Sequence, residues 1–400
     1  MYRPLLIDYN YQITNNASGQ IARTFWETLS PEKYDVTIVS ALSEDGMNSK
    51  WPVFPVDGNT WLQKCYRYIY AKGFKDFVYL PDLFFAKYRN RVNKLCDRFV
   101  PSNQYDYIHT ISNPQIVQLI GLDLKRKTGH PWVAQFYDPW VENTVCDFKL
   151  NSSQKHYDKL ELMIAQNADL IIHTNDLIVD SWIKRYGSIV EKKIIKLPLS
   201  FNMHLKQLTE DRHPNDRINI VHIGTIYGGR TIKDFVDALK EIKESGINIE
   251  KRVVFKFIGG VDEKEIKYVE DNGLNDLFVF YGALHPSQLE QYYQEADYFL
   301  ALDVKSNKSY FYPSKLMMYY YYKKPIIGVT TKGSVMDYDL KESQNISIYY
   351  DNKEETKNML LKILRSPIIG ANNNKEYWKR FSVESVIEEY ENALIKFIIK

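Results

Sequence analysis

A strand, a glycine-bearing loop and a helix follow one another over residues 218–246, and this unit constrains the fold more than any other stretch. Its apolar run has the length of one strand and consists of Ile218, Ile220, Val221 and Ile223. The loop then reads GTIYGGR, and apolar residues recur at helical spacing until Gly246. The amide groups of the first helical turn are expected to face the loop and attract an anion. Arg230 stands where it can bind a phosphate in a bidentate manner, and an ordinary turn with a surface arginine is the alternative.

Strand-length and helix-length patterns alternate along the whole chain. We expect strands over 5–8, 35–39, 106–109, 132–136, 170–173, 194–197, 218–223, 253–258, 277–280, 298–302 and 325–329. We expect helices over 20–29 (capped by Ser18), 115–127, 153–168, 176–186 (capped by Asn175), 232–245, 263–272, 287–295, 313–323, 354–364 and 383–399. Alternation of this kind requires parallel sheets with right-handed crossovers, and 201–217 is expected to link two domains built in this way.

The composition sets the class of protein and excludes several functions. A chain of 400 residues is too long for one core, and 44% hydrophobic with 26% charged residues indicates globular domains. A net charge of +2 argues against a nucleic-acid-binding protein. Three cysteines are too few and too scattered for a disulfide framework or a zinc site. Because no signal-peptide pattern and no bilayer-length apolar run occurs, we expect a soluble or peripheral protein of the cytoplasm.

Residues 51–98 combine aromatic with basic side chains. Trp61, Arg67, Lys72 and Lys75 are among them, and acids are few after Trp61. Aromatic rings settle at the depth of lipid head groups, while lysine stems extend to the aqueous phase. This composition therefore predicts a surface that contacts an anionic membrane. Two amphipathic helices with their aromatic residues packed inwards are the alternative.

An acid follows one of the expected strands directly. The strand 132–136 is followed by Tyr-Asp-Pro-Trp, which places Asp138 at its carboxyl end, where parallel sheets bind ligands. Nothing in the spacing pairs Asp138 with a histidine. A turn or capping aspartate is the alternative.

Several ordered blocks of the sequence resemble one enzyme family. They are YDYIH at 105–109 with Asn-Pro at 113–114, PW at 131–132 with DPW at 138–140, ADLII at 168–172, KLP at 196–198, GTIYGGR at 224–230, FIGG at 257–260, YG at 281–282, AD at 296–297, PSKL at 313–316 and KPII at 324–327. In order and spacing these blocks resemble glycosyltransferase family 4, a retaining group with the GT-B fold that builds bacterial polysaccharides. The resemblance covers nearly the whole chain.

The resemblance implies an α/β protein with two Rossmann-like, doubly wound domains facing a cleft. Residues 1–203 would bind the acceptor, 204–375 would bind the nucleotide sugar, and the helix in 376–400 would cross back to the first domain. The implied reaction moves a sugar from a nucleotide diphosphate to a lipid-linked saccharide in cell-surface polysaccharide synthesis. It requires no tightly bound cofactor or metal, and the enzyme would be peripheral on the inner face of the plasma membrane.

The resemblance also assigns residues to the donor site. Arg230 and Lys315 would neutralise the diphosphate as it leaves, and Asp138 would be a polar group of the catalytic site. The other donor-binding positions are Gly19, Gly224, Gly259, Gly260, Gly282, Ser314 and Leu316. Each glycine can instead serve a tight turn, and Lys315 can instead be a solvated lysine of the first helical turn.

The sequence departs from the family at several functional positions. Two glutamates usual in this region are replaced by Tyr310 and Met318, and the family's histidine falls on Ile111 or Ser112. An Asp-x-Asp at 337–339 falls in an expected loop, so no cation site is predicted. These departures leave two alternatives open. One is a catalytically silent GT-B protein that binds saccharide or a partner enzyme, and the other is a GT-B sugar-nucleotide epimerase.

Overall fold

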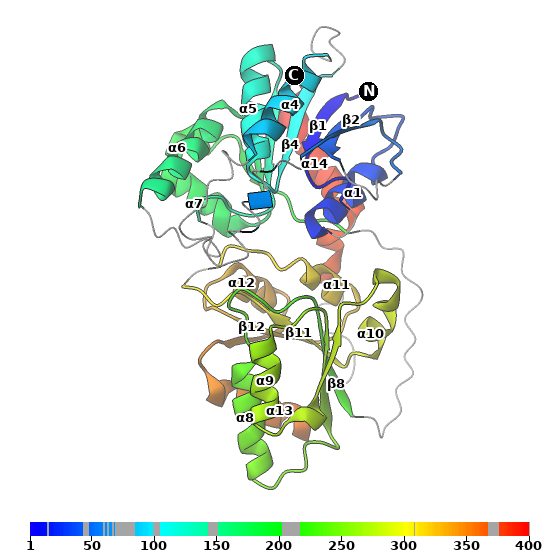
Figure 1. The fold of residues 1–400 in the computed structure, drawn as a ribbon, viewed down its shortest axis with the longest axis vertical. Coiled ribbons are helices and arrows are strands. Elements are labelled where there is room, and N and C mark those ends of the chain that lie inside the picture. The colour runs from blue at the N-terminus through cyan, green and yellow to red at the C-terminus, as the bar shows by residue number, and fades with distance from the viewer. Residues whose placement is uncertain are drawn as a thin grey trace. The chain divides into compact units, whose positions relative to one another are not determined.

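The computed structural model describes most of the chain. The described residues are 1–13, 16–42, 48–58, 61, 64–65, 68, 85–98, 105–142, 151–201, 217–307, 309–366 and 376–399. Contacts between Cα atoms divide the chain into unit 1, which comprises Met1–Met203 and Arg380–Lys400, and unit 2, which comprises His204–Lys379 (Figure 1). Most of the expected linker, 202–216, lies outside the described residues. Among the described residues, no helix is both long and apolar enough to cross a membrane.

Unit 1 is built on a parallel sheet of seven strands in the order β3-β2-β1-β4-β5-β6-β7 (Figure 1). The strands are β1 (Pro4–Asp8), β2 (Thr37–Ala41), β3 (Val53–Val56), β4 (Tyr107–Ser112), β5 (Trp132–Phe136), β6 (Leu170–His173) and β7 (Ile194–Lys196). The helices are α1 (Ala17–Thr28), α4 (Ala86–Cys96), α5 (Ile116–Thr128), α6 (Asn151–Asn167), α7 (Asp176–Tyr186) and α14 (Val383–Phe397). The strand order reverses between β1 and β4, and such switch points are where doubly wound sheets bind ligands.

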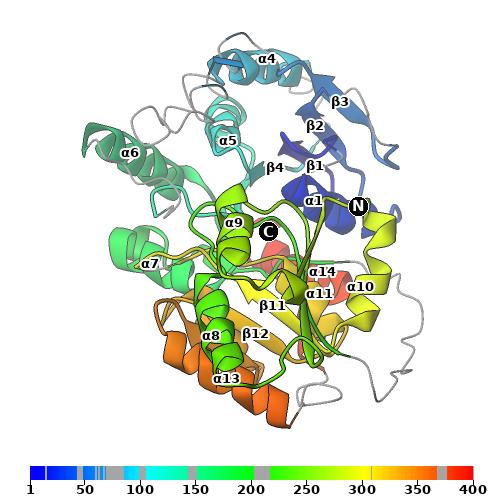
Figure 2. The ribbon, with the colours of Figure 1, turned by 60° about the horizontal axis from the view of Figure 1, so that its bottom comes forward.

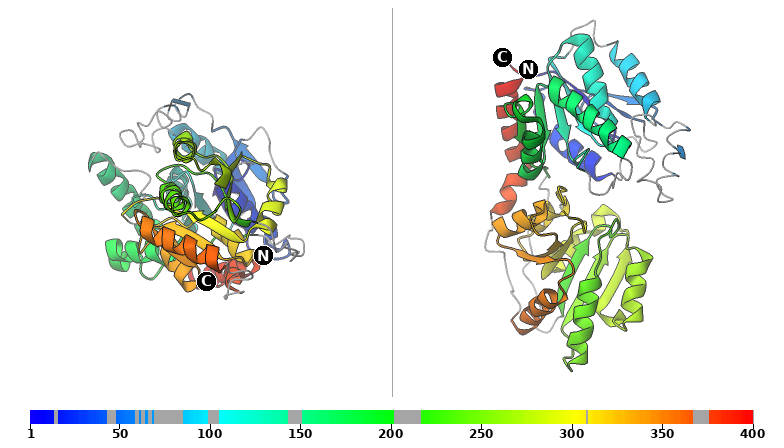
Figure 3. Two further views of the ribbon diagram at one scale, coloured as in Figure 1. Left: turned by 90° about the horizontal axis from the view of Figure 1, so that it is seen from below. Right: turned by 90° about the vertical axis from the view of Figure 1, so that its left-hand side faces the viewer.

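The last helix, α14, is held to unit 1 by a buried polar network, and Figure 3 shows it in red beside this sheet. The hydroxyl of Tyr390 lies 3.0 Å from that of Tyr107 and 2.8 Å from Nδ1 of His109. On the other side of the ring, Nε2 of His109 lies 2.9 Å from Oε1 of Gln135. Because an amide oxygen only accepts, Nε2 carries the proton and Nδ1 accepts from Tyr390. Burial lowers the pKa of His109 to about 3, so the ring is neutral and matches this network.

Unit 2 contains a second parallel sheet, with six strands in the order β10-β9-β8-β11-β12-β13. The strands are β8 (Ile218–Ile223), β9 (Val253–Ile258), β10 (Phe278–Gly282), β11 (Tyr298–Leu302), β12 (Ile326–Thr330) and β13 (Ile346–Tyr349). The helices are α8 (Lys233–Glu244), α9 (Glu263–Asp271), α10 (Glu290–Glu295), α11 (Lys315–Tyr321), α12 (Val335–Glu342) and α13 (Lys353–Arg365). Helix α8 packs against α13, and its buried side chains are those at the predicted helical spacing (Figure 2). Here the switch point lies between β8 and β11.

Three local expectations are wrong. Helix α1 is capped by Asn16, whose Oδ1 accepts from the amide of Gly19 at 3.0 Å, whereas the expected cap, Ser18, donates to that same oxygen at 2.6 Å. The elements β3 and β13 were not expected, because short strands with a proline or with polar residues give weak patterns. The Asp-x-Asp at 337–339 lies in a helix rather than in a loop.

Both aspartates of that helix, α12, accept hydrogen bonds from other groups of the protein. The carboxylate of Asp337 is buried and accepts from the amide of Gly333 at 2.8 Å and from Nζ of Lys341 at 2.9 Å. The carboxylate of Asp339 accepts from three hydroxyl groups, which belong to Tyr312, Tyr320 and Tyr377. Hydrogen bonds from protein groups therefore satisfy these carboxylates, and their role in the fold is structural.

Candidate functional site

Four of the predicted glycines meet at the carboxyl ends of β8, β9 and β10. The amide of Gly224 donates to the carbonyl of Ile258 at 2.7 Å, and the amide of Gly259 donates to the carbonyl of Gly282 at 2.7 Å. Gly260 accepts from the amide of Ile226 at 2.8 Å. The three segments at the ends of these strands are thus joined by backbone hydrogen bonds.

Gly259 is the position at which a side chain is least compatible with this edge. Its φ is +133°, and a Cβ placed there would lie 2.4 Å from the carbonyl oxygen of Gly224. The neighbouring atoms are backbone, which has little freedom to move aside. The loops therefore pack closely only because residue 259 has no side chain.

Lys315 extends from the first residue of α11 to the loop that follows β8. A Cβ on Gly224 would lie 2.7 Å from Nζ of Lys315, so the missing side chain at 224 makes room for the ammonium group. The neighbouring Ser314 caps α11 without a side-chain hydrogen bond. Leu316 is different, because its side chain is fully buried and its amide donates to the carbonyl of Pro313 at 2.9 Å.

Arg230 brings a second positive charge to the same place. Its Nε donates to the carbonyl of Leu302 at 3.2 Å, and its guanidinium carbon lies 5.0 Å from the centre of the exposed ring of Tyr227. Loss of water and the charge of Arg230 lower the pKa of Lys315 to about 7. A lysine and an arginine placed this close together form a site to which an anion would be attracted.

Asp303, a carboxylate after β11 that senses the charge of Arg230, already has hydrogen-bond partners in the protein. Oδ1 of Asp303 accepts from the amide of Val304 at 2.7 Å and from Oγ of Ser309 at 3.0 Å. Its Oδ2 accepts from Oγ1 of Thr330 at 2.9 Å. Asp303 is fully buried, and burial raises its pKa while the charge of Arg230 lowers it. Asp303 thus connects the segment after β11 to the last residue of β12 by hydrogen bonds.

The first turn of α8 is not the anion site that the sequence indicated. A carboxylate oxygen of Glu265, in α9, accepts from the amide of Ile232 at 2.9 Å and from Oγ1 of Thr231 at 2.8 Å. That hydroxyl oxygen in turn accepts from the amide of Lys233 at 3.1 Å. The protein's own carboxylate occupies this helix start. Two features remain that suit an external anion. They are the side-chain cations Lys315 and Arg230, and the edge of the sheet that carries Gly224, Gly259, Gly260 and Gly282, which we call the glycine edge.

His222 belongs to this cluster and was not expected from the sequence. It is fully buried in β8, and its Nδ1 lies 2.8 Å from the carbonyl oxygen of Leu300. Its Nε2 lies 3.1 Å from Nζ of Lys315. The only sign in the sequence was a histidine within the apolar run 218–223.

In unit 1, polar side chains form a chain of hydrogen bonds at the carboxyl ends of β1, β4 and β5. Nδ2 of Asn10 donates to Oγ of Ser18 at 2.9 Å and to the carbonyl of Asn113 at 2.5 Å. Nδ2 of Asn113 donates to Oδ2 of Asp138 at 2.6 Å, and burial raises the pKa of Asp138. Gly19 lies beside this chain, because a Cβ there would be 2.2 Å from the carbonyl oxygen of Asn10. This close contact gives Gly19 a structural reason to lack a side chain.

Asp8 is a further acid at this edge of unit 1. It closes β1 and is 1% exposed, and burial raises its pKa to about 7. Its Oδ1 accepts from the amide of Asn10 at 2.8 Å, whereas Oδ2 has no hydrogen-bond partner within the described residues. Its place at the end of an apolar strand is the signal that sequence reasoning overlooked.

Only part of the basic aromatic segment lies within the described residues. Trp61 is 74% exposed, whereas Arg67, Lys72 and Lys75 lie outside the described residues. The following helix, α4, buries Tyr88, Val92 and Cys96 against unit 1. Its opposite face is exposed and basic, and consists of Lys87, Asn90, Arg91 and Lys94. We call these four residues the basic face of α4.

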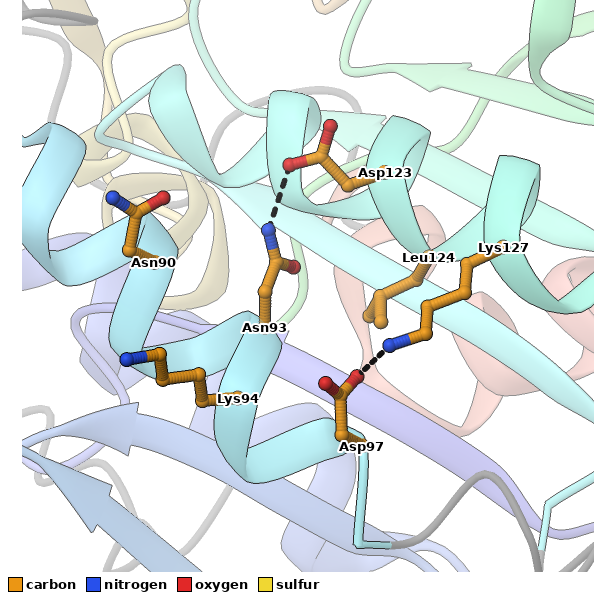
Figure 4. Close-up of a pocket in the computed structure, with 7 residues that line it drawn as sticks. All are labelled: Asn90, Asn93, Lys94, Asp97, Asp123, Leu124 and Lys127. Carbon is orange, nitrogen blue, oxygen red and sulfur yellow. Dashed lines mark hydrogen bonds and ion pairs between the residues drawn. The ribbon is translucent and has the colours of Figure 1, made fainter.

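A polar pocket of about 380 Å³ lies between α4 and α5 (Figure 4). Its carboxylates are paired with protein donors, because Asp123 accepts from Nδ2 of Asn93 at 2.7 Å and from Arg89 at 2.6 Å. Asp97 pairs in the same way with Lys127. Figure 4 shows Lys94 on α4 extending past this pocket. The pocket thus extends the exposed polar surface of α4 rather than forming a separate charged site.

Comparison with known proteins gives matches in structure alone. No protein-family model and no curated protein sequence matches the chain. A sucrose-phosphate synthase from Thermosynechococcus elongatus is 15% identical, with a TM-score of 0.71 and 99% of each chain covered. The HepE protein of Anabaena, in complex with UDP and glucose, is 12% identical, with a TM-score of 0.64 and coverage of 99% of this chain and 100% of HepE. The lipopolysaccharide outer core galactosyltransferase WaaB is 14% identical, with a TM-score of 0.63 and 99% of each chain covered.

These three structures are GT-B glycosyltransferases, and each matches the chain along nearly its full length. Together with the two parallel sheets and their alternating helices, they show that this chain has the two-domain, Rossmann-like GT-B fold. The fold class expected from the sequence is therefore confirmed. Identities of 12–15% establish the fold and leave the activity to be inferred from the site.

Proposed function

We propose that this chain is a retaining glycosyltransferase of family 4 that moves a sugar from a nucleotide diphosphate donor to a lipid-linked saccharide in cell-surface polysaccharide synthesis. One observation carries the proposal: Lys315 and Arg230 converge on the glycine edge of unit 2, at its topological switch point. The complexes of HepE with UDP and with UDP-glucose support the choice of donor.

In the proposed reaction, the glycine edge and its two cations stabilise the leaving group, which is the nucleoside diphosphate. When the bond between sugar and diphosphate breaks, negative charge develops on the phosphate oxygens, and fixed cations lower the energy of that state. Arg230 is held by the carbonyl of Leu302, and Lys315 by Nε2 of His222, so both charges are placed before the donor arrives. The absence of side chains at these glycines would let phosphate oxygens come close to the backbone. No tightly bound metal or cofactor is included in this proposal.

The acceptor is assigned to unit 1. Asp8, Asn113 and Asp138 present carboxylate and amide groups at the switch point between β1 and β4, and such groups suit the hydroxyls of a saccharide. We assign Asp138 to the polar part of the catalytic site. Its bond with Nδ2 of Asn113 orients the carboxylate.

Turnover of nucleotide sugars tests the proposal. We expect the full-length protein to release nucleoside diphosphate from one member of a donor panel when a lipid-linked saccharide extract is present, and to keep the anomeric configuration of the sugar. Tyr310 and Met318 stand where the family has glutamates, and this departure favours two alternative functions. The same assay distinguishes them. Binding without turnover would identify a silent saccharide-binding or partner-binding protein. A new nucleotide sugar formed without acceptor would identify an epimerase.

We also propose that unit 1 associates with the anionic inner face of the plasma membrane, which would make the protein cytoplasmic and peripheral. The basic face of α4 supports this, because lysine and arginine near an anionic surface each contribute about 1 kcal/mol of binding free energy. We expect the double variant Lys87→Glu, Lys94→Glu to cosediment with phosphatidylserine vesicles at least about 30-fold more weakly than the unchanged protein, because the loss of two such contributions is about 2 kcal/mol.

Salt and a matched variant provide the controls for the vesicle experiment. Binding should weaken as salt rises, because surface charges are screened within about 10 Å at 0.1 M salt. Lys240→Glu with Lys267→Glu changes the net charge equally but lies in unit 2, and it should bind vesicles normally. Equal binding to neutral and anionic vesicles would reject the membrane proposal and leave the transferase proposal intact.

A further inference from the structure

His222 is the least expected residue beside the two cations, Lys315 and Arg230. It lies in the central strand β8, is fully buried, and is followed after one residue by Gly224. Histidines in such apolar positions are commonly satisfied by backbone groups alone. Here Nδ1 meets the backbone carbonyl of Leu300, whereas Nε2 faces the lysine assigned to the donor.

The contacts fix which nitrogen of His222 carries the proton. The carbonyl of Leu300 can only accept, so Nδ1 carries a hydrogen and donates at 2.8 Å. Burial and the charges of Lys315 and Arg230 hold the pKa of His222 well below its usual value, so the ring is neutral. Nε2 therefore has a free lone pair and accepts one N–H of Lys315 at 3.1 Å.

The geometry points to His222 as a positioning residue, whose Nε2 fixes the ammonium group of Lys315 beside Gly224 for contact with a diphosphate. A lysine stem has many rotamers, and holding one N–H removes this freedom before the ligand binds. The other two N–H groups of the ammonium stay available to phosphate oxygens. This inference rests on the proposed function, because it assumes that Lys315 binds the diphosphate.

The surroundings of Lys315 make this interaction sensitive to pH. His222 faces it from β8, and Arg230 faces it from the loop before α8. Asp303, after β11, is bonded to Ser309 and Thr330, and the charge of Arg230 lowers the pKa of Asp303 against the effect of burial. Tyr319, on the same helix as Lys315, accepts from the amide of Ile223 at 2.9 Å. Within the described residues, Lys315 has no ion pair, so a neutral acceptor is what supports its charged form against burial.

Binding of UDP to variants of His222 tests the inference. His222→Phe keeps the ring volume and removes both hydrogen bonds, whereas His222→Gln can still donate to Leu300 and accept from Lys315. We expect His222→Phe to bind UDP about 10-fold more weakly and uridine unchanged, since losing a bond to a charged group costs about a factor of ten. His222→Gln should recover most of the affinity.

The pH profile separates positioning from a structural role. UDP affinity of the unchanged protein should fall as pH rises past about 7, because Lys315 then loses its proton in the free protein. In His222→Phe this fall should begin at lower pH, because the charged lysine has lost its acceptor. Thermal unfolding of each variant checks that unit 2 remains folded.

Other outcomes would overturn the inference in distinguishable ways. If His222→Phe binds UDP with the unchanged affinity and pH profile while Lys315→Ala does not, His222 does not position the lysine and the proposed function stands. If His222→Phe loses UDP and uridine affinity equally, its role is structural. If the unchanged protein binds no nucleoside diphosphate at all, the proposed function fails, and the inference with it.

Discussion

Replacing Lys315 by alanine is expected to slow sugar transfer about 10²–10³-fold, which is the usual loss when one preorganised charge-stabilising donor is removed from an active site. The loss should fall mainly on kcat, because charge on the diphosphate is largest when its bond to the sugar is breaking. UDP affinity should fall more than uridine affinity, because the ammonium group contacts phosphate and not the nucleoside. Steady-state kinetics and calorimetry with the two ligands measure these effects.

Stability provides the control for this variant. Because the pKa of Lys315 in the folded protein is about 7, far below that of a free lysine, its charge costs stability in full below pH 7. That cost disappears as pH rises towards the unfolded value. Lys315→Ala should therefore have an unchanged or higher melting temperature at neutral pH. Lys240→Ala, on the exposed face of α8, should keep full activity.

Arg230→Ala separates the two cations. Its transfer rate should also fall, and equal losses of UDP and uridine affinity would remove Arg230 from the phosphate site. Arg217→Ala is the matched control, because that arginine lies before β8 and bonds the carbonyls of Glu250 and Asp276. A Lys315→Ala protein with unchanged kcat would contradict the assignment of the site to this edge.

Local sequence patterns were sufficient to predict those elements whose position depends on their own residues. The strands 132–136, 170–173 and 298–302 begin and end where the predicted runs do, because all of their residues except Gln135 are buried. The glycine loops were recognisable for a related reason, since only glycine suits a positive φ or a close backbone contact. The pairing of Arg230 with Lys315 was expected from the family resemblance, and both follow strands that end at the same edge of the sheet.

Interactions between distant residues were not predictable from such patterns. His222 and Lys315 are 93 positions apart, and Glu265 reaches the start of α8 from 33 positions away. Local reasoning placed an external anion at that helix start, although the fold supplies a carboxylate of its own. Asp339 was assigned to a loop for the same reason, because the tyrosines that bind it lie elsewhere in the chain. Buried polar residues are thus where sequence reasoning was weakest.

Gly259→Ala is expected to destabilise unit 2 by about 4 kcal/mol, from a positive φ that alanine rarely adopts and from forced overpacking. The added Cβ would lie 2.4 Å from the carbonyl oxygen of Gly224 and 2.6 Å from its carbon, so the loop after β8 must move. That loop carries the backbone beside Lys315, and UDP binding should be lost with it. Hydrogen exchange of β8 and β9, compared with that of β4 and β5 in unit 1, measures the local effect.

Gly282→Ala distinguishes the contact from the backbone conformation. Its φ is +70°, and a Cβ there would meet no atom within 4 Å, so only the conformational cost of about 1–2 kcal/mol applies. The difference between the two variants therefore reports the clash with Gly224 together with the less accessible φ of +133° at Gly259. If both accelerate exchange equally, the close approach of the loops contributes nothing beyond the left-handed φ. If Gly259→Ala exchanges far faster and loses UDP while Gly282→Ala keeps it, backbone contact between the loops after β8 and β9 holds the cation site in place.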